Sequence, residues 1–458
     1  MKAMKKVSSE EILGGDLMKV MIAISIPIII TNLIDGFYGI IDSLFVAYIG
    51  SLEIAAVTFV APIYETLNAI GVGLAIAGGS IVGRYLGERD EEKVKHSIEQ
   101  LSMIGLILGL IIGIGSTVFS QTILIRASIT PSLLEVSETY YRMLALSVPF
   151  WYVTLVFLAI RRAHGDTQET MKINMLSLIL KVVFSAIFIL VFKMGLLGLG
   201  LSSLLAKVCC SMRAFYGLFF AKDALVNLKK VRARLDLIKR IAFVSFPLII
   251  EKSMVSFGFV IVNKYVLDYG EAVLAAYGLT NKVNTIFFKA TAGFGTALAV
   301  IVAQNMGAGN VDRVKEAIKK SLILAVGFAL FSCAVLLPFK EPIAALFVDP
   351  ADPTYQHMIN AMSVYTASVI PWAVMEVAMG LFQGTTLTTY NLTVSVLRIY
   401  LFRVPIVMFL TMPIWGLAEY GIWYAMLISN IFSATLSMII IFVRRARIFK
   451  VDKITQNS

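Results

Sequence analysis

Charged residues are scarce in this sequence. Only 15% of the 458 residues are charged, 58% are hydrophobic, and the mean hydropathy is +0.84. A soluble domain is roughly 45–50% apolar and about 25% charged. A water-soluble core cannot cover this surplus of apolar side chains, so lipid is predicted to be the solvent for much of the chain.

Cysteine and histidine are also sparse, and their spacing excludes several kinds of site. The three cysteines and three histidines form no cluster with metal-ligand spacing, and a disulfide framework is not expected. A Gly-x-x-x-x-Gly-Lys phosphate loop is missing, which argues against direct use of ATP. Paired Asp-rich motifs are missing too. A membrane-embedded enzyme is therefore the third and weakest hypothesis, and no cofactor or metal is expected.

Long apolar runs dominate what is present. A helix needs about 20 mostly apolar residues to cross the hydrocarbon layer. Twelve runs meet this requirement, and the sequence therefore predicts an all-α membrane protein with twelve transmembrane helices. The runs cover residues 20–49, 54–83, 98–122, 139–163, 171–193, 195–221, 239–267, 272–303, 318–338, 359–383, 390–412 and 418–443.

Basic residues gather in alternate loops and at both ends of the chain. Lysine and arginine mark the cytoplasmic side of a membrane protein. We therefore expect a multi-pass protein of the plasma membrane with both termini in the cytoplasm, as an even number of spans requires. The net charge of +11 is then a signal of topology and not of a nucleic-acid partner.

The sequence repeats itself at an offset of about 220 residues. The segment Ser-Ile-Pro-Ile-Ile-Ile that starts at Ser25 returns as Ser-Phe-Pro-Leu-Ile-Ile at Ser245, and Gly50 returns as Gly270. Six spans per unit leave both halves in the same orientation, which is the parallel-repeat architecture of several secondary transporters. We predict lobes at residues 1–222 and 238–458, joined by a cytoplasmic linker at 223–237. A duplicated scaffold without a cavity is the alternative.

Several short segments resemble the multidrug and toxic compound extrusion (MATE) family, in its prokaryotic, DinF-like form. They include Asn32, the Asp-Ser-Leu-Phe-Val segment from Asp42, Gly50, Gly165 and the Gly-Ala-Gly segment from Gly307, and the likeness runs from about residue 15 to 445. The resemblance implies two six-helix lobes forming a V. It also implies export of amphipathic drugs or metabolites by alternating access, in exchange for protons or sodium. The same superfamily contains flippases for lipid-linked sugars, which is the second hypothesis.

Acidic residues within the first span are candidates for ion coupling, because a charge inside a membrane is costly to keep. Asp35 and Asp42 lie seven residues apart, within about 20° of each other around a helix. Asn32 lies one turn before Asp35. In the MATE family pattern that this sequence resembles, Asp42 matches an acid implicated in ion coupling. Asp35 is more easily explained as a member of a structural ion pair or as a residue at the mouth of the cavity.

The fifth span departs from the family pattern. The resemblance leads us to expect an Asn and, one turn later, an Asp that face the acid of the first helix. This sequence has Lys181 and Ser185 there. The lysine either neutralises Asp42 and weakens a proton-binding scheme, or forms a salt bridge that breaks when Asp42 is protonated. Both readings stay open, and so does the identity of the coupling ion.

The second half carries further acids and several cations within its spans. Glu251, four residues after Pro247, resembles the acid-bearing pattern of another branch of the family and is a further ion-coupling candidate. Lys264 and Arg403 are expected to extend to the membrane interface. Cations that face a cavity would suit an anionic substrate, which favours the flippase hypothesis. The predicted substrate-cavity residues are Asn32, Ser185, Lys282, Lys289, Glu376 and Arg398. We expect a monomer that binds a small molecule.

Overall fold

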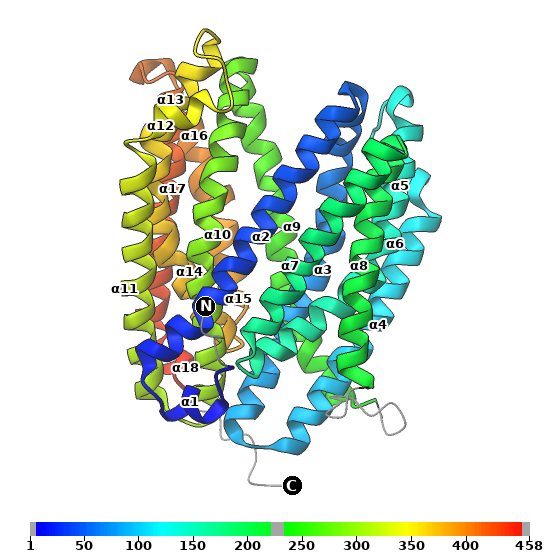
Figure 1. The fold of residues 1–458 in the computed structure, drawn as a ribbon. Coiled ribbons are helices and arrows are strands. Elements are labelled where there is room, and N and C mark those ends of the chain that lie inside the picture. The colour runs from blue at the N-terminus through cyan, green and yellow to red at the C-terminus, as the bar shows by residue number, and fades with distance from the viewer. Residues whose placement is uncertain (1–5, 221–232, 451–458) are drawn as a thin grey trace. The chain divides into compact units, whose positions relative to one another are not determined.

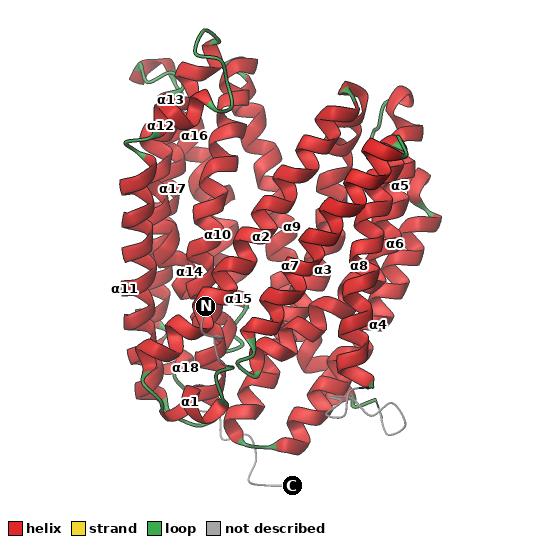
Figure 2. Cartoon of the chain, in the orientation of Figure 1, coloured by secondary structure: helices red, strands yellow, loops and turns green. Residues whose placement is uncertain are grey.

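A computed structural model describes residues 6–220 and 233–450 of the chain, and all regular secondary structure in these ranges is helical (Figures 1 and 2). Twelve helices in this part are long and apolar enough to cross a membrane, which confirms the predicted number. Most extend a few residues beyond the predicted runs, since a helix continues into the polar residues outside the hydrocarbon layer.

The spans of the two halves follow one another in the same order. In the first half they are α2 (Leu17–Ile49), α3 (Ser51–Glu88), α4 (Glu91–Val118), α6 (Pro131–Ala163), α7 (Thr167–Ser185) with the π-helix η1 (Ala186–Val191), and α8 (Gly195–Phe219). In the second they are α9 (Leu235–Leu267), α10 (Glu271–Gly307), α11 (Val311–Leu336), α13 (Pro353–Tyr365) with η2 (Thr366–Ser368) and α14 (Val369–Gly384), α15 (Thr389–Val396) with the π-helix η3 (Leu397–Arg403) and α16 (Val404–Leu410), and α17 (Tyr420–Val443).

Shorter helices complete the description, and two of them repeat as well. A short helix follows the third span of each half, α5 (Ser120–Arg126) in the first and α12 (Lys340–Ala345) in the second. The remaining short elements are α1 (Ser9–Gly14), η4 (Pro413–Trp415) and α18 (Arg445–Ile448). This matching order of elements is what a duplicated six-span unit should give.

Aspartates start several of these helices. The side chain of Asp90 accepts a hydrogen bond from the backbone N–H of Lys93 at 2.9 Å, and Asp166 accepts one from Glu169 at 3.2 Å. An aspartate at this position satisfies an N–H group that the first turn leaves without a partner. The capping aspartates, and not hydropathy alone, therefore determine where α4 and α7 begin.

The chain forms two compact units, and each unit takes part of a helix from the other half of the sequence. The first unit comprises Met1–Ser9 and Leu33–Ser253, and the second comprises Glu10–Asn32 and Met254–Ser458. The chain therefore passes between units at the first residue of α1 and again inside α2 and α9, and the last two are long continuous helices (Figure 1). The units differ from the predicted lobes by this exchange. The predicted linker lies mostly outside the described residues, and its last three residues belong to α9.

Glycines on the second span of each half explain the exchange. A β-carbon on Gly293 of α10 would lie 2.6 Å from Cγ1 of Ile29, so only glycine lets the first half of α2 approach so closely within the second unit. In the first unit, a β-carbon on Gly73 of α3 would lie 2.7 Å from Cγ1 of Ile249 on α9. The two contacts are related by the 220-residue offset of the repeat.

Each unit has its own apolar core. In the first unit, side chains of α3, α4, α6 and α8 pack together with the N-terminal half of α9, around residues such as Leu101, Phe157 and Leu248. In the second, Tyr277, Tyr365 and Trp423 are central to a core built from α9, α10, α13 and α17. The exchanged part of α9 thus contributes to the core of the first unit.

Replacing Gly380 with alanine should destabilise the second unit. A β-carbon at Gly380 of α14 would lie 2.0 Å from the carbonyl oxygen of Gly295 on α10, so the two backbones would have to separate. We expect a loss of about 1–3 kcal/mol in the free energy of unfolding, typical of an overpacked core. Thermal unfolding in detergent measures it. Gly327→Ala on α11 is the control, because it meets no atom within 4 Å and should be neutral or stabilising.

Candidate functional site

An ion pair lies inside the first unit. Asp42 comes from the C-terminal half of α2 and Lys181 from α7, and Oδ1 of Asp42 lies 3.0 Å from Nζ of Lys181. The lysine side chain is fully buried, whereas the aspartate is 19% exposed. The exposed part of the pair therefore belongs to the aspartate, although its Oδ1 atom is buried. The predicted proximity of these two residues is found in the structure.

The ammonium group of Lys181 is surrounded by oxygen atoms. It donates hydrogen bonds to the carbonyl oxygen of Leu199 at 3.0 Å and to the hydroxyls of Ser202 at 3.0 Å and Ser203 at 2.6 Å, all on α8. With Asp42, four oxygen atoms lie within 3.0 Å of Nζ, and we call them the oxygen cluster. A buried charge is tolerated when it is both paired and hydrogen-bonded, and Lys181 meets both conditions.

Ser185 belongs to the same network. It lies one turn after Lys181, is fully buried, and its hydroxyl is 2.8 Å from that of Ser202. The Ser202 hydroxyl also contacts Lys181 and donates to Leu199. Ser185 therefore supports the ion pair through Ser202, although it was predicted as a residue of the substrate cavity.

The helix that carries Lys181 changes its winding directly after Ser185, where η1 begins. The second half has a π-helix in its fifth span too, and Arg398 lies in it. Asn174 precedes Lys181 by seven residues, as Asn391 precedes Arg398, so the two cations hold equivalent places in the repeat. Short π-helical turns often occur at functional sites.

Asp42 has no acidic counterpart in the second half of the repeat. At the 220-residue offset from Asp42 the second half has Val262, which is buried in an apolar core. The ion pair of the first unit therefore has no acidic counterpart at the equivalent position of the second.

A second buried lysine, which the sequence reading missed, lies on α8 of the first unit. Lys207 donates to the hydroxyl of Tyr64 and, at 3.3 Å, to that of Ser147. Its ammonium also lies 4.6 Å from the ring centre of Tyr64 and 5.6 Å from that of Trp151. A lysine one turn after Ser203, in an otherwise apolar run, was the available sequence signal.

The other predicted ion-coupling acids lie elsewhere. Asp35 is an exposed residue of α2. Glu251 on α9 is buried, with 5% of its surface exposed, and pairs with Lys252 at 3.2 Å. Neither has a described contact with the oxygen cluster.

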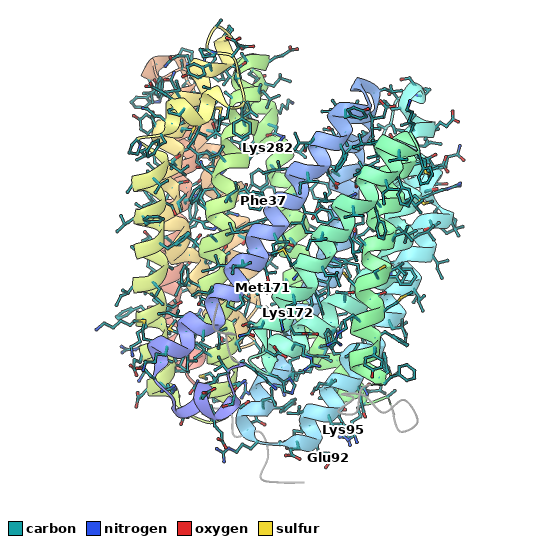
Figure 3. The ribbon with its side chains drawn as sticks, viewed as in Figure 1. Phe37, Glu92, Lys95, Met171, Lys172 and Lys282 are labelled. Carbon is teal, nitrogen blue, oxygen red and sulfur yellow. The ribbon has the colours of Figure 1, made fainter. Side chains whose placement is uncertain are left out.

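The remaining predicted cavity residues belong to the second unit. The side-chain amide of Asn32 donates to the carbonyl oxygen of Lys289 at 2.9 Å, which ties α2 to α10. Lys282 is exposed on α10 (Figure 3). Glu376 is half-buried on α14, and the guanidinium of Arg398 lies 4.7 Å from the ring centre of Trp372. The structure brings Asn32 and Lys289 into contact.

Arg403 corrects a prediction. It was expected to extend to the membrane interface, but only 2% of its surface is exposed. It donates to the hydroxyl of Ser429 at 3.0 Å and to the side-chain oxygen of Asn430 at 2.8 Å. The interpretation was wrong because these partners come from α17, and the sequence around Arg403 gives no sign of them.

Comparisons with known proteins agree with this architecture. The MatE family model matches residues 27–187 and 247–410, one match in each half. The multidrug export protein MepA of Staphylococcus aureus is 23% identical over 438 residues, covering 94% of each chain. The probable multidrug resistance protein YoeA of Bacillus subtilis is 22% identical and covers 72% of this chain and 73% of its own.

Solved structures share the fold. A MOP superfamily transporter from Pyrococcus furiosus superposes with a TM-score of 0.91, at 22% identity, over 98% of this chain and 100% of its own. A multidrug resistance MATE family transporter in an outward-facing conformation gives the same values. The family model covers more than half of the chain, in both halves of the repeat. The chain therefore belongs to the MatE family, whose members are membrane transporters and not enzymes.

Proposed function

We propose that this protein exports amphipathic organic compounds by exchange with protons, through alternating access, and that Asp42 and Lys181 form the coupling site. The observation that carries the proposal is the buried ion pair inside the first unit. Protonation of Asp42 removes the negative charge that balances Lys181. The pair is thus a local two-state element of the kind that a proton can switch.

The position of the ammonium group favours protons over sodium. Sodium is a hard cation that binds carboxylate, carbonyl and hydroxyl oxygens, and these are the atoms that surround Nζ of Lys181. The lysine therefore occupies the place that a free cation would take. Asp42 remains partly exposed and can still exchange a proton.

The relatives support the type of substrate. MepA is named a multidrug export protein, and it matches 94% of this chain. Aromatic side chains close to the ion pair, such as Tyr38, whose ring centre lies 5.7 Å from Nζ of Lys181, provide flat surfaces for organic compounds. We extend the role of an exporter to this chain on these grounds.

Transport in liposomes tests the proposal. The purified protein is reconstituted, and a fluorescent lipophilic cation is followed under a proton gradient and, separately, under a sodium gradient. We expect movement under the proton gradient alone. Movement that depends on neither gradient, with folded protein in the membrane, would contradict the proposed coupling of export to protons.

Lys207 favours a second candidate function, the translocation of an anionic lipid or lipid-linked sugar. Its hydrogen-bond partners, Tyr64 and Ser147, are neutral, and aromatic rings flank its charge. Such a group suits a phosphate attached to an apolar molecule. A dithionite-quenching assay with a fluorescent anionic lipid separates the candidates, since an exporter of drugs should not accelerate its exchange between leaflets.

We further propose that the protein acts as a monomer in the plasma membrane with both termini in the cytoplasm. The basic loops and ends of the chain support the orientation. Alkaline phosphatase fused to the C-terminus should stay inactive, and an active fusion would reverse the orientation. The mass of the protein in detergent, measured by light scattering, tests the monomer.

A further inference from the structure

A group of buried side chains in the second unit carries positive charge and hydrogen-bond donors without an anion to receive them. It is centred on Arg403 at the end of η3, and it includes Ser429 and Asn430 of α17. We call these three residues the Arg403 cluster. Each is at most 2% exposed.

The charge of Arg403 is not balanced by the described part of the chain. The guanidinium has five N–H groups, and its hydrogen bonds go to Ser429 and Asn430, which are both neutral. No carboxylate of a described residue lies within ion-pair distance of it. A buried cation without a counter-charge is unfavourable, and native proteins normally pair it or bind an ion.

A hydrogen-bond donor without a partner lies beside this charge. The side-chain oxygen of Asn430 accepts from Arg403, so its amide nitrogen lies close to the guanidinium, and that nitrogen has no hydrogen-bond partner.

We propose that the Arg403 cluster binds a small inorganic anion of the size of chloride. A guanidinium and an amide N–H are both donors, so a neutral or cationic ligand would leave them unsatisfied. The three side chains are almost completely enclosed, which leaves no opening for the body of an organic acid. The anion is therefore a structural ion of the second unit and not the transported substrate.

Thermal unfolding of the purified full-length protein tests the site. The protein is compared in chloride and in isethionate, a much larger anion, at equal ionic strength. A ligand that binds the folded state alone raises the unfolding temperature in a saturable way. We expect a saturable rise of several degrees with chloride and its loss in Arg403→Gln. Arg445→Gln is the matched control, because Arg445 is an exposed guanidinium on α18 and should keep the full rise.

A second measurement uses the unaltered protein and so does not require that any variant folds. Crystals of the unaltered protein grown with bromide should give an anomalous peak beside Arg403 and Asn430. The proposal is overturned if chloride has no effect and no peak is found there. It is equally overturned if Arg403→Gln folds and retains the chloride effect.

Discussion

Asp42→Asn is expected to stop proton-driven export and to lower the free energy of unfolding by about 3–5 kcal/mol, the usual cost of removing one partner of a buried ion pair. Lys181 is fully buried, so the variant leaves its charge without a counter-charge. Lys181→Met removes the opposite partner and should destabilise less, because Asp42 is partly exposed and can be hydrated or protonated. Thermal unfolding and transport in liposomes measure the two effects separately.

The double variant Asp42→Asn/Lys181→Met separates folding from coupling. With both charges removed, most of the lost stability should return, while export stays lost because no carboxylate remains to carry the proton. Asp35→Asn is the control on the same helix, and because Asp35 is exposed it should retain export. Proton-driven export by the double variant would exclude Asp42 as the coupling residue.

Lys181→Asn is expected to change the coupling ion. The substitution removes the ammonium group but keeps Asp42 and the oxygens of Leu199, Ser202 and Ser203, and it adds an amide oxygen. Hard cations bind such sets of oxygen ligands. When the proton gradient is collapsed with an ionophore, we expect a sodium gradient to drive export by the variant but not by the unaltered protein.

Lys207→Asn is the matched control for this experiment. It removes a different buried lysine of the same unit but leaves Lys181 in the oxygen cluster. This variant should not respond to sodium. A folded Lys181→Asn protein that is also insensitive to sodium would show that the lysine does not occupy a cation site.

The fold could be predicted from the sequence because the bilayer imposes a length on every span. The predicted run at residues 20–49 became α2 (Leu17–Ile49), and the run at 239–267 became α9 (Leu235–Leu267). The exchange inside these two helices was not predicted. Apolar periodicity shows that a helix spans the membrane but not which unit its first half packs against, and here the close approach at Gly73 and Gly293 decides it.

The candidate site was predictable in part. Asp42 and Lys181 stood out as charges within apolar runs, and the resemblance placed the fifth span opposite the first. The partners Ser202 and Ser203 could not be found in this way, because serine is common in membrane helices and only the packing of α7 on α8 brings their hydroxyls to Nζ. The burial of Arg403 was missed for the same reason, since its partners Ser429 and Asn430 come from a later helix.

The exchange of half-helices also fixes the order in which the protein can be completed during synthesis. The first unit is finished only when the ribosome has made the part of α9 that ends at Ser253. The segment Glu10–Asn32 leaves the ribosome early, yet its packing partners on α10 and α11, which include Gly293 and Arg313, follow more than 250 residues later. Domains generally fold as they emerge. This segment therefore stays without its packing partners until α10 and α11 have been made. Neither sequence half, made alone, contains a complete unit.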